Sequence, residues 1–297
     1  MHGFVQKVHR RIREKKLFAR SDRLVLAVSG GPDSVSMACA LHTLNYQLTL
    51  AWVDHGQRKT AADEGRLVER LSKTLDTPFI SLLAQPTGHS ESALRDARYE
   101  VLAQCEGDWV ATAHTASDQA ETVLMRMIRG TGVTGLSGIP DIRGRYVRPL
   151  LGVTRGDVLS YLASIEQEYA IDPTNASLDP LRNRVRHRLL PVLESEFQPQ
   201  IARSLQRLAE SVTLDREALE SAVMKHTELN GSATAALRAV SEGFRVHVVR
   251  HLCPVSITLE RATAVSRLVV GDIRGKVQIE GGVYAAIERG NLVFIYE

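Results

Sequence analysis

The 297-residue sequence has no long apolar run, few cysteines and little net charge. No stretch approaches the ~18 consecutive apolar residues that a transmembrane helix needs, so no membrane span is expected. The three cysteines, Cys39, Cys105 and Cys253, are far apart and form no CxxC pair. They therefore give no case for a zinc site, an iron–sulfur cluster or a disulfide framework. The basic N-terminus lacks the apolar segment of a signal peptide, so a reducing cytoplasm is the expected compartment.

Composition places the chain among ordinary globular proteins. Hydrophobic residues make up 44% and charged residues 24%, which excludes a disordered chain, a collagen and a coiled-coil rod. The length suits about two domains. A net charge of +3, from 37 basic and 34 acidic residues, permits a nucleic-acid partner without requiring one.

Short apolar runs alternate with segments of helical spacing in the first half of the chain. The runs are Leu24–Val28, Leu48–Val53, Phe79–Leu83 and Trp109–Ala113, and the helical segments are 35–46, 61–76, 91–105 and 115–129. A basic amphipathic helix over 4–18 precedes them. This alternation predicts an α/β fold with a doubly wound parallel sheet, whose ligands bind beyond the carboxyl ends of the strands.

The pattern changes after residue 130. A Gly-rich basic stretch over 130–150 leads to helices over 154–198 that we expect to be broken by Pro173, Pro180 and Pro191. A long helix over 201–225 follows, and then a small α+β unit. Its helices are expected near 235–250 and 258–268, and its strands near 277–280, 283–287 and 292–296. We therefore expect a nucleotide-binding catalytic domain at 1–212, and a linker helix with a small C-terminal domain at 213–297.

The strongest motif is Ser29-Gly30-Gly31-Pro32-Asp33-Ser34, which follows the first strand and opens a helix. Glycines let backbone N–H groups approach an anion, and the helix N-terminus adds partial positive charge. A carboxylate beside phosphate suits Mg²⁺, so Asp33 is the candidate metal ligand. The alternative is a tight turn in which Asp33 or Ser34 caps the helix. No GxxxxGK(S/T) motif is present, and the GxGxxG at Gly130–Gly135 follows a helix rather than a strand, so neither P-loop nor dinucleotide binding is indicated.

This element resembles the SGGxDS signature of the N-type ATP pyrophosphatases. The resemblance implies that ATP is cleaved to pyrophosphate and AMP, with AMP transferred to a carbonyl-type oxygen. The ATP-binding residues it implies are Ser29, Gly30, Gly31, Pro32, Asp33 and Ser34, with Val53 at the end of the second strand.

Further segments, in order over about residues 20–190, resemble the tRNA(Ile)-lysidine synthases. They are Val53–Arg58, Ala97–Tyr99, Ala113–Thr122, Arg129–Gly132 with Gly135–Gly138, Arg148–Leu151 and Arg182–Arg186. The C-terminal unit resembles, more weakly, the small tRNA-binding domain of the family's shorter members. The implied reaction adenylates C2–O2 of the wobble cytidine in the CAU-anticodon tRNA(Ile), and the ε-amine of free lysine then displaces AMP. Thr115 stands where the family usually has a second histidine.

The chemistry of lysine agrees with the residue types in these segments. Asp118 and Glu121 suit its ammonium groups, and Arg98 suits its carboxylate. The family resemblance places lysine handling on the same three residues. The expected catalytic residues are Asp33, His114 and Asp118, with Asp118 as the first candidate for a proton acceptor. The alternatives are that His114 is a core histidine, that Asp118 only forms a capping box with Thr115, and that Asp54 and His55 order a loop rather than bind a ligand.

Arginines gather in two places, over 126–155 and over 182–188. The residues expected to bind tRNA are Arg129, Arg148, Arg182, Arg184 and Arg186. Because alternate residues cannot share one helix face, we expect some of Arg182 to Arg188 to pair internally. A solvated basic face is the alternative.

Three other functions stay open on the sequence. A tRNA thiolase of the same superfamily would need paired cysteines or a cluster, which this sequence lacks. A small-molecule synthetase would not need the arginine clusters, and a non-catalytic nucleotide sensor would bind ATP without releasing pyrophosphate. The family resemblance also makes a homodimer an expectation.

Overall fold

The computed structural model describes residues 2–54, 61–88, 91–170 and 181–297. It divides into two compact units, unit 1 at Met1–Val212 and unit 2 at Thr213–Glu297. Within the described residues, no helix is both long and apolar enough to cross a membrane.

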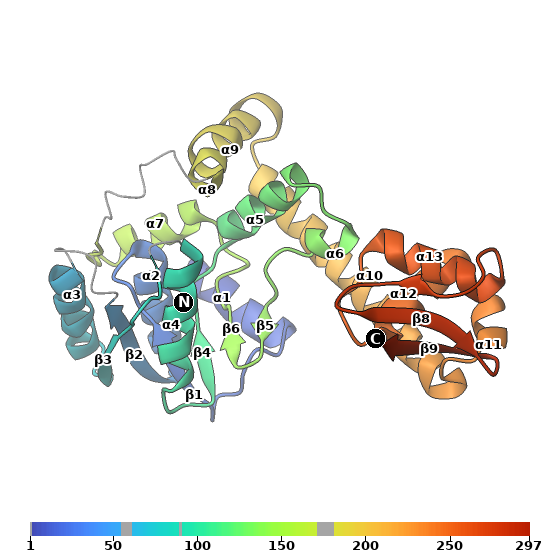
Figure 1. The fold of residues 1–297 in the computed structure, drawn as a ribbon. Coiled ribbons are helices and arrows are strands. Elements are labelled where there is room, and N and C mark those ends of the chain that lie inside the picture. The colour runs from blue at the N-terminus through green and yellow to red at the C-terminus, as the bar shows by residue number, and fades with distance from the viewer. Residues whose placement is uncertain (1, 55–60, 89–90, 171–180) are drawn as a thin grey trace. The chain divides into compact units, whose positions relative to one another are not determined.

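A six-stranded sheet forms the centre of unit 1 (Figure 1). Its order is β3 (Phe79–Leu83), β2 (Gln47–Asp54), β1 (Arg23–Ala27), β4 (Trp109–Ala111), β6 (Tyr146–Val147) and β5 (Ile142–Arg143). All neighbours are parallel except β5, which pairs antiparallel with β6. The chain order reverses between β1 and β4, and such a reversal opens a crevice at the carboxyl ends of the two strands.

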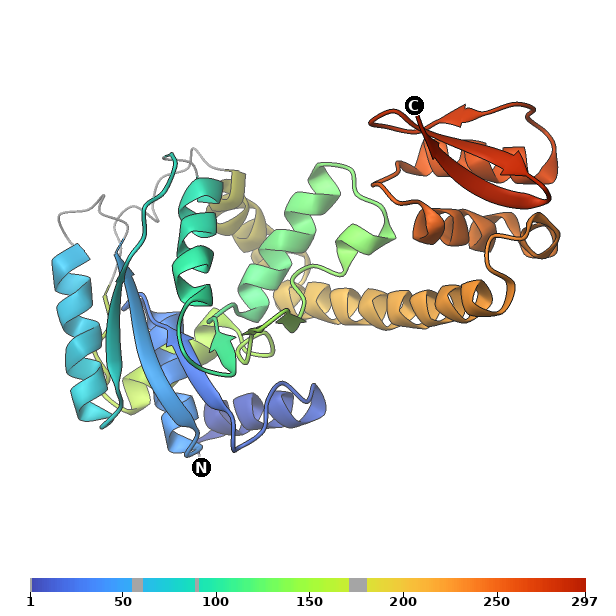
Figure 2. The same ribbon diagram turned by 60° about the horizontal axis from the view of Figure 1, so that its bottom comes forward.

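Side chains of the central strands alternate between two hydrophobic layers. Leu24 and Leu26 of β1 face one layer, and Val25 faces the other. The first layer is covered by α1 (Gly3–Glu14), α2 (Pro32–Thr43), α3 (Ala61–Thr74) and α7 (Arg155–Ser164), and the second by α4 (Glu91–Ala103) (Figures 1 and 2). Burial on both faces explains why these strands read as continuous apolar runs, and it confirms the expected α/β class.

A separate small core lies under the helical segment that follows residue 180. Here α5 (Ala116–Ile128) packs on Val185, Leu190 and the first half of α10 (Ile201–Asn230) through Ala120, Val123 and Leu124. This core holds α5 and the 181–197 segment together. The four-residue helix α6 (Val133–Leu136) follows α5.

The expectation that Pro191 breaks a helix is wrong. The chain runs without a break through α8 (Leu181–Arg184), a π-helix η2 (Val185–Leu189), α9 (Leu190–Val192) and a second π-helix η3 (Leu193–Phe197). The wider π turns accommodate a proline ring that lacks an N–H and would crowd the preceding turn. Pro173 and Pro180 lie outside the described residues.

Unit 2 has its own core between three helices and a three-stranded antiparallel sheet. The sheet order is β7 (Val277–Gln278), β8 (Val283–Glu288) and β9 (Asn291–Tyr296). The helix expected near 235–250 is two helices, α11 (Thr234–Arg238) and α12 (Glu242–Leu252), because Ser241 caps a new start by accepting from Phe244 N. The third helix is α13 (Leu259–Val270), and α10 runs to Asn230.

Substitutions at two strand leucines test the assigned core. Leu50 in β2 is fully buried, whereas Leu83 in β3 is 62% exposed. Leu50→Ala should lower the free energy of unfolding of unit 1 by about 2–5 kcal/mol, because it leaves a cavity. Leu83→Ala should change it by less than about 0.5 kcal/mol. Urea unfolding followed by tryptophan fluorescence measures this, since Trp52 and Trp109 are the chain's two tryptophans and both lie in unit 1. Equal losses in the two variants would contradict the assignment.

Candidate active site

The Ser29–Ser34 loop joins β1 to α2 at the crevice. Gly30 has φ +85°, a conformation that side chains disfavour, and Pro32 occupies the first turn of α2. Inside the loop, Ser34 Oγ donates to Gly31 O at 2.9 Å and accepts from Ser29 N at 3.2 Å. Within the described residues no side chain caps α2, so the N–H groups of its first turn suit an anion.

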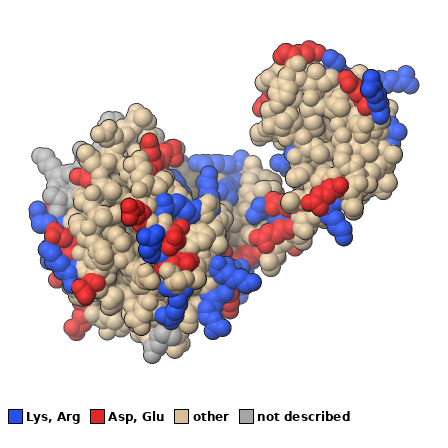
Figure 3. All heavy atoms as spheres, turned by 90° about the horizontal axis from the view of Figure 1, so that it is seen from below, with Lys and Arg blue, Asp and Glu red and all other residues tan. Residues whose placement is uncertain are grey.

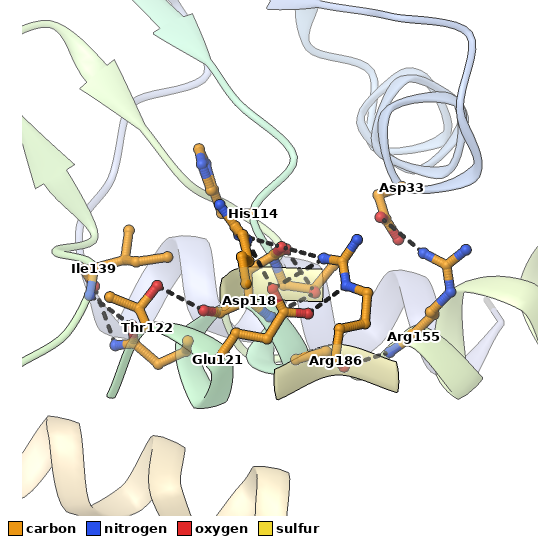
Figure 4. A network of polar contacts seen from close by, with 12 residues as sticks. Asp33, His114, Asp118, Glu121, Thr122, Ile139, Arg155 and Arg186 are labelled. Atoms are coloured by element: carbon orange, nitrogen blue, oxygen red, sulfur yellow. Dashed lines mark hydrogen bonds and ion pairs between the residues drawn. The ribbon is translucent and has the colours of Figure 1, made fainter. Parts of the chain in front are cut away.

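Asp33 lies in the first turn of α2 with a carboxylate that is only partly satisfied. Its Oδ1 is buried and has no hydrogen-bond partner among the described residues, while its Oδ2 lies 3.5 Å from Arg155 Nη1 (Figure 4). Burial, as the larger cause, and the negative charge of Asp118 together raise the pKa of Asp33 to about 6. An orphaned carboxylate oxygen beside an anion-binding helix end fits Mg²⁺. No group of three or more His, Cys, Asp or Glu that could hold a metal occurs among the described residues, so Asp33 would share the ion with phosphate oxygens.

The N-terminus of α5 carries the capping box expected from Thr115 and Asp118. Thr115 Oγ1 accepts from Asp118 N, and Asp118 Oδ2 accepts from Thr115 N at 2.8 Å and from Thr115 Oγ1 at 2.9 Å. The prediction of this box is confirmed. Thr115 therefore satisfies the start of α5 as its N-cap.

Two arginines bind the carboxylates of α5. Asp118 Oδ1 accepts from Arg182 Nη2 at 2.9 Å and from Arg186 Nη2 at 3.1 Å. Glu121, only 1% exposed, accepts from Arg182 Nε at 2.8 Å and from Arg186 Nε at 2.5 Å (Figure 4). The expectation that part of the 182–188 arginine run pairs internally is confirmed. We refer to these four side chains as the ion-pair quartet.

The pKa of Asp118 reflects this setting. Burial alone would raise it, but the Arg182 guanidinium and the neighbouring His114 outweigh burial, and the pKa lies below its usual value. Asp118 is therefore an anion at neutral pH. A saturated anionic carboxylate favours a role as a ligand of cations over a role as a proton acceptor.

His114 lies between β4 and α5 with Nδ1 3.0 Å from Thr112 Oγ1. Burial lowers its pKa well below the usual value, against the attraction of Asp118, and the charge of Arg148 lowers it further. The imidazole is therefore neutral near pH 7. It can offer one N–H to a ligand, but it brings no positive charge.

Arg98 and Val53, predicted from the sequence, lie at the same end of the sheet. Arg98 is half-buried on α4, with its guanidinium 5.7 Å from the ring centre of Tyr99, and its charge acts on His114. Val53 pairs with Leu82 of β3 and packs into the layer under α4. His55 lies outside the described residues.

The arginines of the 126–148 and 182–188 segments that lie outside the ion-pair quartet include both interior and surface residues. Arg148 is 1% exposed and donates to Pro140 O, and Arg126 donates to Gly135 O and Gly138 O, so both order the 130–148 segment. Arg129 and Arg184 are exposed. Basic and acidic side chains are interspersed on the face of unit 1 seen in Figure 3. Arg129 and Arg184 thus present their charge to solvent, whereas Arg148 does not.

Two residues that hold the site together were not foreseen individually. Gln119 accepts from Ile139 N at 2.5 Å and donates to Ile139 O at 3.1 Å, which ties the glycine-rich segment to α5. Arg155 entered the sequence analysis only as one member of an arginine run, and the structure places it opposite Asp33. The charge of an arginine is visible in a sequence, but its partner is not.

Comparison with known proteins assigns the family. The sequence pattern of the PP-loop domain matches residues 4–193, which include the Ser29–Ser34 loop and the ion-pair quartet. The chain belongs to the PP-loop family. The Ser29–Ser34 loop lies within the matched residues, and we refer to it below as the PP-loop.

Several curated relatives of this PP-loop protein are tRNA(Ile)-lysidine synthases. The tRNA(Ile)-lysidine synthase of Geobacter sulfurreducens is 35% identical over 87% of the chain, and that of Porphyromonas gingivalis is 36% identical over 81%. The matches cover 62% and 56% of those two proteins. Among solved structures, the U34-tRNA thiolase NcsA of Methanococcus maripaludis matches with a TM-score of 0.56 at 20% identity, over 70% of this chain and 80% of that one, which shows a shared fold.

The raised pKa of Asp33 predicts a pH-dependent gain of stability for Asp33→Asn. A carboxyl group whose pKa is raised on folding favours the folded state while it is protonated. That contribution is lost as the pH rises from the ordinary pKa of the carboxyl in the unfolded chain toward its pKa of about 6 in the folded protein. Asp33→Asn should therefore be more stable than the wild type by about 1–3 kcal/mol at about pH 7.5, with little difference near about pH 4. Urea unfolding at both pH values measures it.

Asp157→Asn is a control in which the expected change in stability has the opposite sign. Burial would raise the pKa of Asp157, but the hydrogen bond from Lys7 lowers it below the usual value. This variant should lose stability at neutral pH, and the loss should shrink in acid as the wild-type carboxylate is protonated. A gain from Asp157→Asn, or none from Asp33→Asn, would contradict the assigned environments.

Proposed function

We propose that this protein is a tRNA(Ile)-lysidine synthase. It uses ATP to adenylate O2 of the wobble cytidine in a CAU-anticodon tRNA(Ile), and joins the ε-amine of free lysine to C2. The observation that carries the proposal is the buried pair Asp118–Glu121, bound to cationic side chains and electrostatically coupled to Asp33 of the PP-loop. An ATP site and a site for organic cations thus share one crevice. The names of the 35–36% identical relatives support the same function.

The PP-loop and the N-terminus of α2 would bind ATP for the first step, the adenylation. In that step cytidine O2 attacks the α-phosphorus of ATP, and the bond to the β-phosphate oxygen breaks as pyrophosphate leaves with the electron pair. The loop glycines and the N-terminus of α2 hold phosphate oxygens. Asp33 would hold Mg²⁺, which supplies charge neutralisation of the phosphates when bound.

The carboxylates of α5 would bind lysine for the second step. In that step the lysine amine bonds to C2, and AMP leaves with O2. Asp118 and Glu121 hold guanidinium groups in this structure, so the ammonium groups of lysine would compete for the same oxygens. Arg98, of fixed charge and near His114, suits the lysine carboxylate. His114 would donate its N–H to the adenylate phosphate.

Recognition of tRNA uses charges that face solvent. Arg129 and Arg184 are exposed on unit 1 and suit backbone phosphates, while Arg182 and Arg186 would contact tRNA only by leaving the quartet. Because tRNA(Met) shares the CAU anticodon, discrimination needs parts of the tRNA outside it, and unit 2 is the proposed reader.

A sulfur-transfer function finds no support in the cysteines. Cys39 and Cys105 are buried, and burial raises the pKa of Cys39 to about 11 and that of Cys105 above its usual value. A buried protonated thiol is a poor nucleophile. The burial of Cys39 and Cys105 therefore supports the ligase proposal over a thiolase function.

One assay tests the proposal. Purified protein, ATP, Mg²⁺, free lysine and a CAU-anticodon tRNA(Ile) transcript are incubated, and the nucleosides are read by mass spectrometry. We expect a cytidine heavier by lysine less water, which is absent when ATP or lysine is omitted. Unmodified cytidine in the complete mixture would refute the proposal.

Glu121→Gln should raise the KM for lysine about tenfold or more, because the buried carboxylate that binds cations loses its charge. The KM for ATP should stay within about twofold, since Glu121 does not touch the PP-loop in the proposed arrangement. Steady-state assays of AMP release at varied lysine measure both.

Glu210→Gln is the matched control, because Glu210 also accepts from a buried arginine, Arg11, at 2.9 Å and lies in unit 1 away from the crevice. It should leave both constants unchanged. The same rise in lysine KM for both variants would mean that Glu121 acts on folding rather than on lysine.

A further inference from the structure

Arg155 faces the PP-loop from a different helix. Its Nη1 lies 3.5 Å from Asp33 Oδ2, and Figure 4 shows the two side chains pointing toward one another from α7 and α2. Among the described residues, Asp33 is the one carboxylate within ion-pair distance of this guanidinium. A cation thus stands beside the loop that the family uses for phosphate.

The backbone of Arg155 is fixed, while its side chain is not. Thr154 and Asp157 form a capping box at the start of α7, and Asp157 is held in turn by Lys7 at 2.7 Å. Arg155 N donates to Ser117 Oγ at 3.3 Å, which ties α7 to the first turn of α5. The side chain is nevertheless 50% exposed, and its contact to Asp33 is longer than a charge-assisted hydrogen bond. The guanidinium is therefore anchored at its base and able to turn at its end.

The ion pair between Arg155 and Asp33 is also weaker than the contact that the Asp33 carboxylate would make with a divalent metal ion. Asp33 is the proposed metal ligand, and a divalent ion attracts it more strongly than a half-exposed guanidinium does. ATP would bring several phosphate oxygens to the N-terminus of α2, and a planar guanidinium binds such oxygens in pairs. Asp33 and Arg155 then have better partners than each other.

We propose that Arg155 binds the β- or γ-phosphate of ATP, the part that leaves as pyrophosphate. This deepens the proposed function and rests on it for the identity of the reaction. As the bond between the α-phosphorus and the bridging oxygen breaks, negative charge grows on the pyrophosphate. Arg155 neutralises that charge from α7, in addition to the N-terminus of α2.

Nucleotide binding by the full-length chain tests this without tRNA or lysine. Titration calorimetry with three probes, MgATP, AMP and inorganic pyrophosphate with Mg²⁺, is run on the wild type and on Arg155→Ala. The variant should bind MgATP and pyrophosphate about 10- to 100-fold more weakly, as for loss of a charge-assisted contact, and AMP within about twofold of the wild type. Arg155→Lys should recover part of the loss, because it keeps the charge without the planar fork.

Arg203→Ala is the matched control. Arg203 is 47% exposed, lies in unit 1 and approaches Asp157 at 3.9 Å rather than Asp33. It should bind all three probes as the wild type does. Thermal melting of each variant should match the wild type, since both side chains are about half exposed.

Several results would overturn the inference. The first is an unchanged affinity of Arg155→Ala for MgATP. The second is an equal loss of affinity for AMP and MgATP in that variant, which would mark a structural role. The third is a wild type that binds MgATP no more tightly than AMP. Failure of the proposed function is separate. A wild type that makes no lysidine, together with an ATP-selective loss in Arg155→Ala, would refute the reaction and keep Arg155 as a phosphate ligand. Lysidine formation with no such loss would refute the role of Arg155 alone.

Discussion

The ion-pair quartet on α5, α8 and η2 is the interaction on which the site depends. Carboxylates as buried as Glu121 are stable only when cations match them, and removal of one partner from such a pair costs about 3–5 kcal/mol. Arg182 and Arg186 meet this need and dock the 181–189 segment on α5, where Val185 joins the small core beneath. The same oxygens can accept another organic cation only by exchange. The negative charge of Asp118 also acts on Asp33, which couples the proposed lysine site to the proposed ATP site.

Sheet topology decides which side chains meet. The reversal between β1 and β4 places the PP-loop and the His114–Asp118 segment at neighbouring strand ends, although about 80 residues separate them along the chain. The hairpin of β5 and β6 continues the sheet, and Arg148 follows it into the interior beside His114. Each candidate functional group therefore comes from a short segment held by rigid elements, which is the arrangement that the proposed adenylation needs in order to orient its reactants.

Much of this could be read from the sequence, for identifiable reasons. Strands buried on both faces leave apolar runs, and Thr115 and Asp118 stand at capping-box spacing, so both were predicted correctly. Two-residue strands such as β5 and β6 leave no periodicity and were missed. The sequence also could not separate arginines by location: Arg148 is interior, Arg129 is exposed, and Arg182 pairs with α5. The spacing of Arg182 and Arg186, four residues apart, was the available signal that they share a face.

The central claim is that the two sides of the crevice act in one reaction through the cytidine oxygen. It is tested most directly with a CAU-anticodon tRNA(Ile) carrying oxygen-18 at O2 of the wobble cytidine. The AMP released with ATP and lysine is then analysed by mass spectrometry. The account predicts that the heavy oxygen leaves in AMP, in proportion to the lysidine formed. Heavy oxygen retained in the tRNA, or AMP that carries only light oxygen, would contradict it.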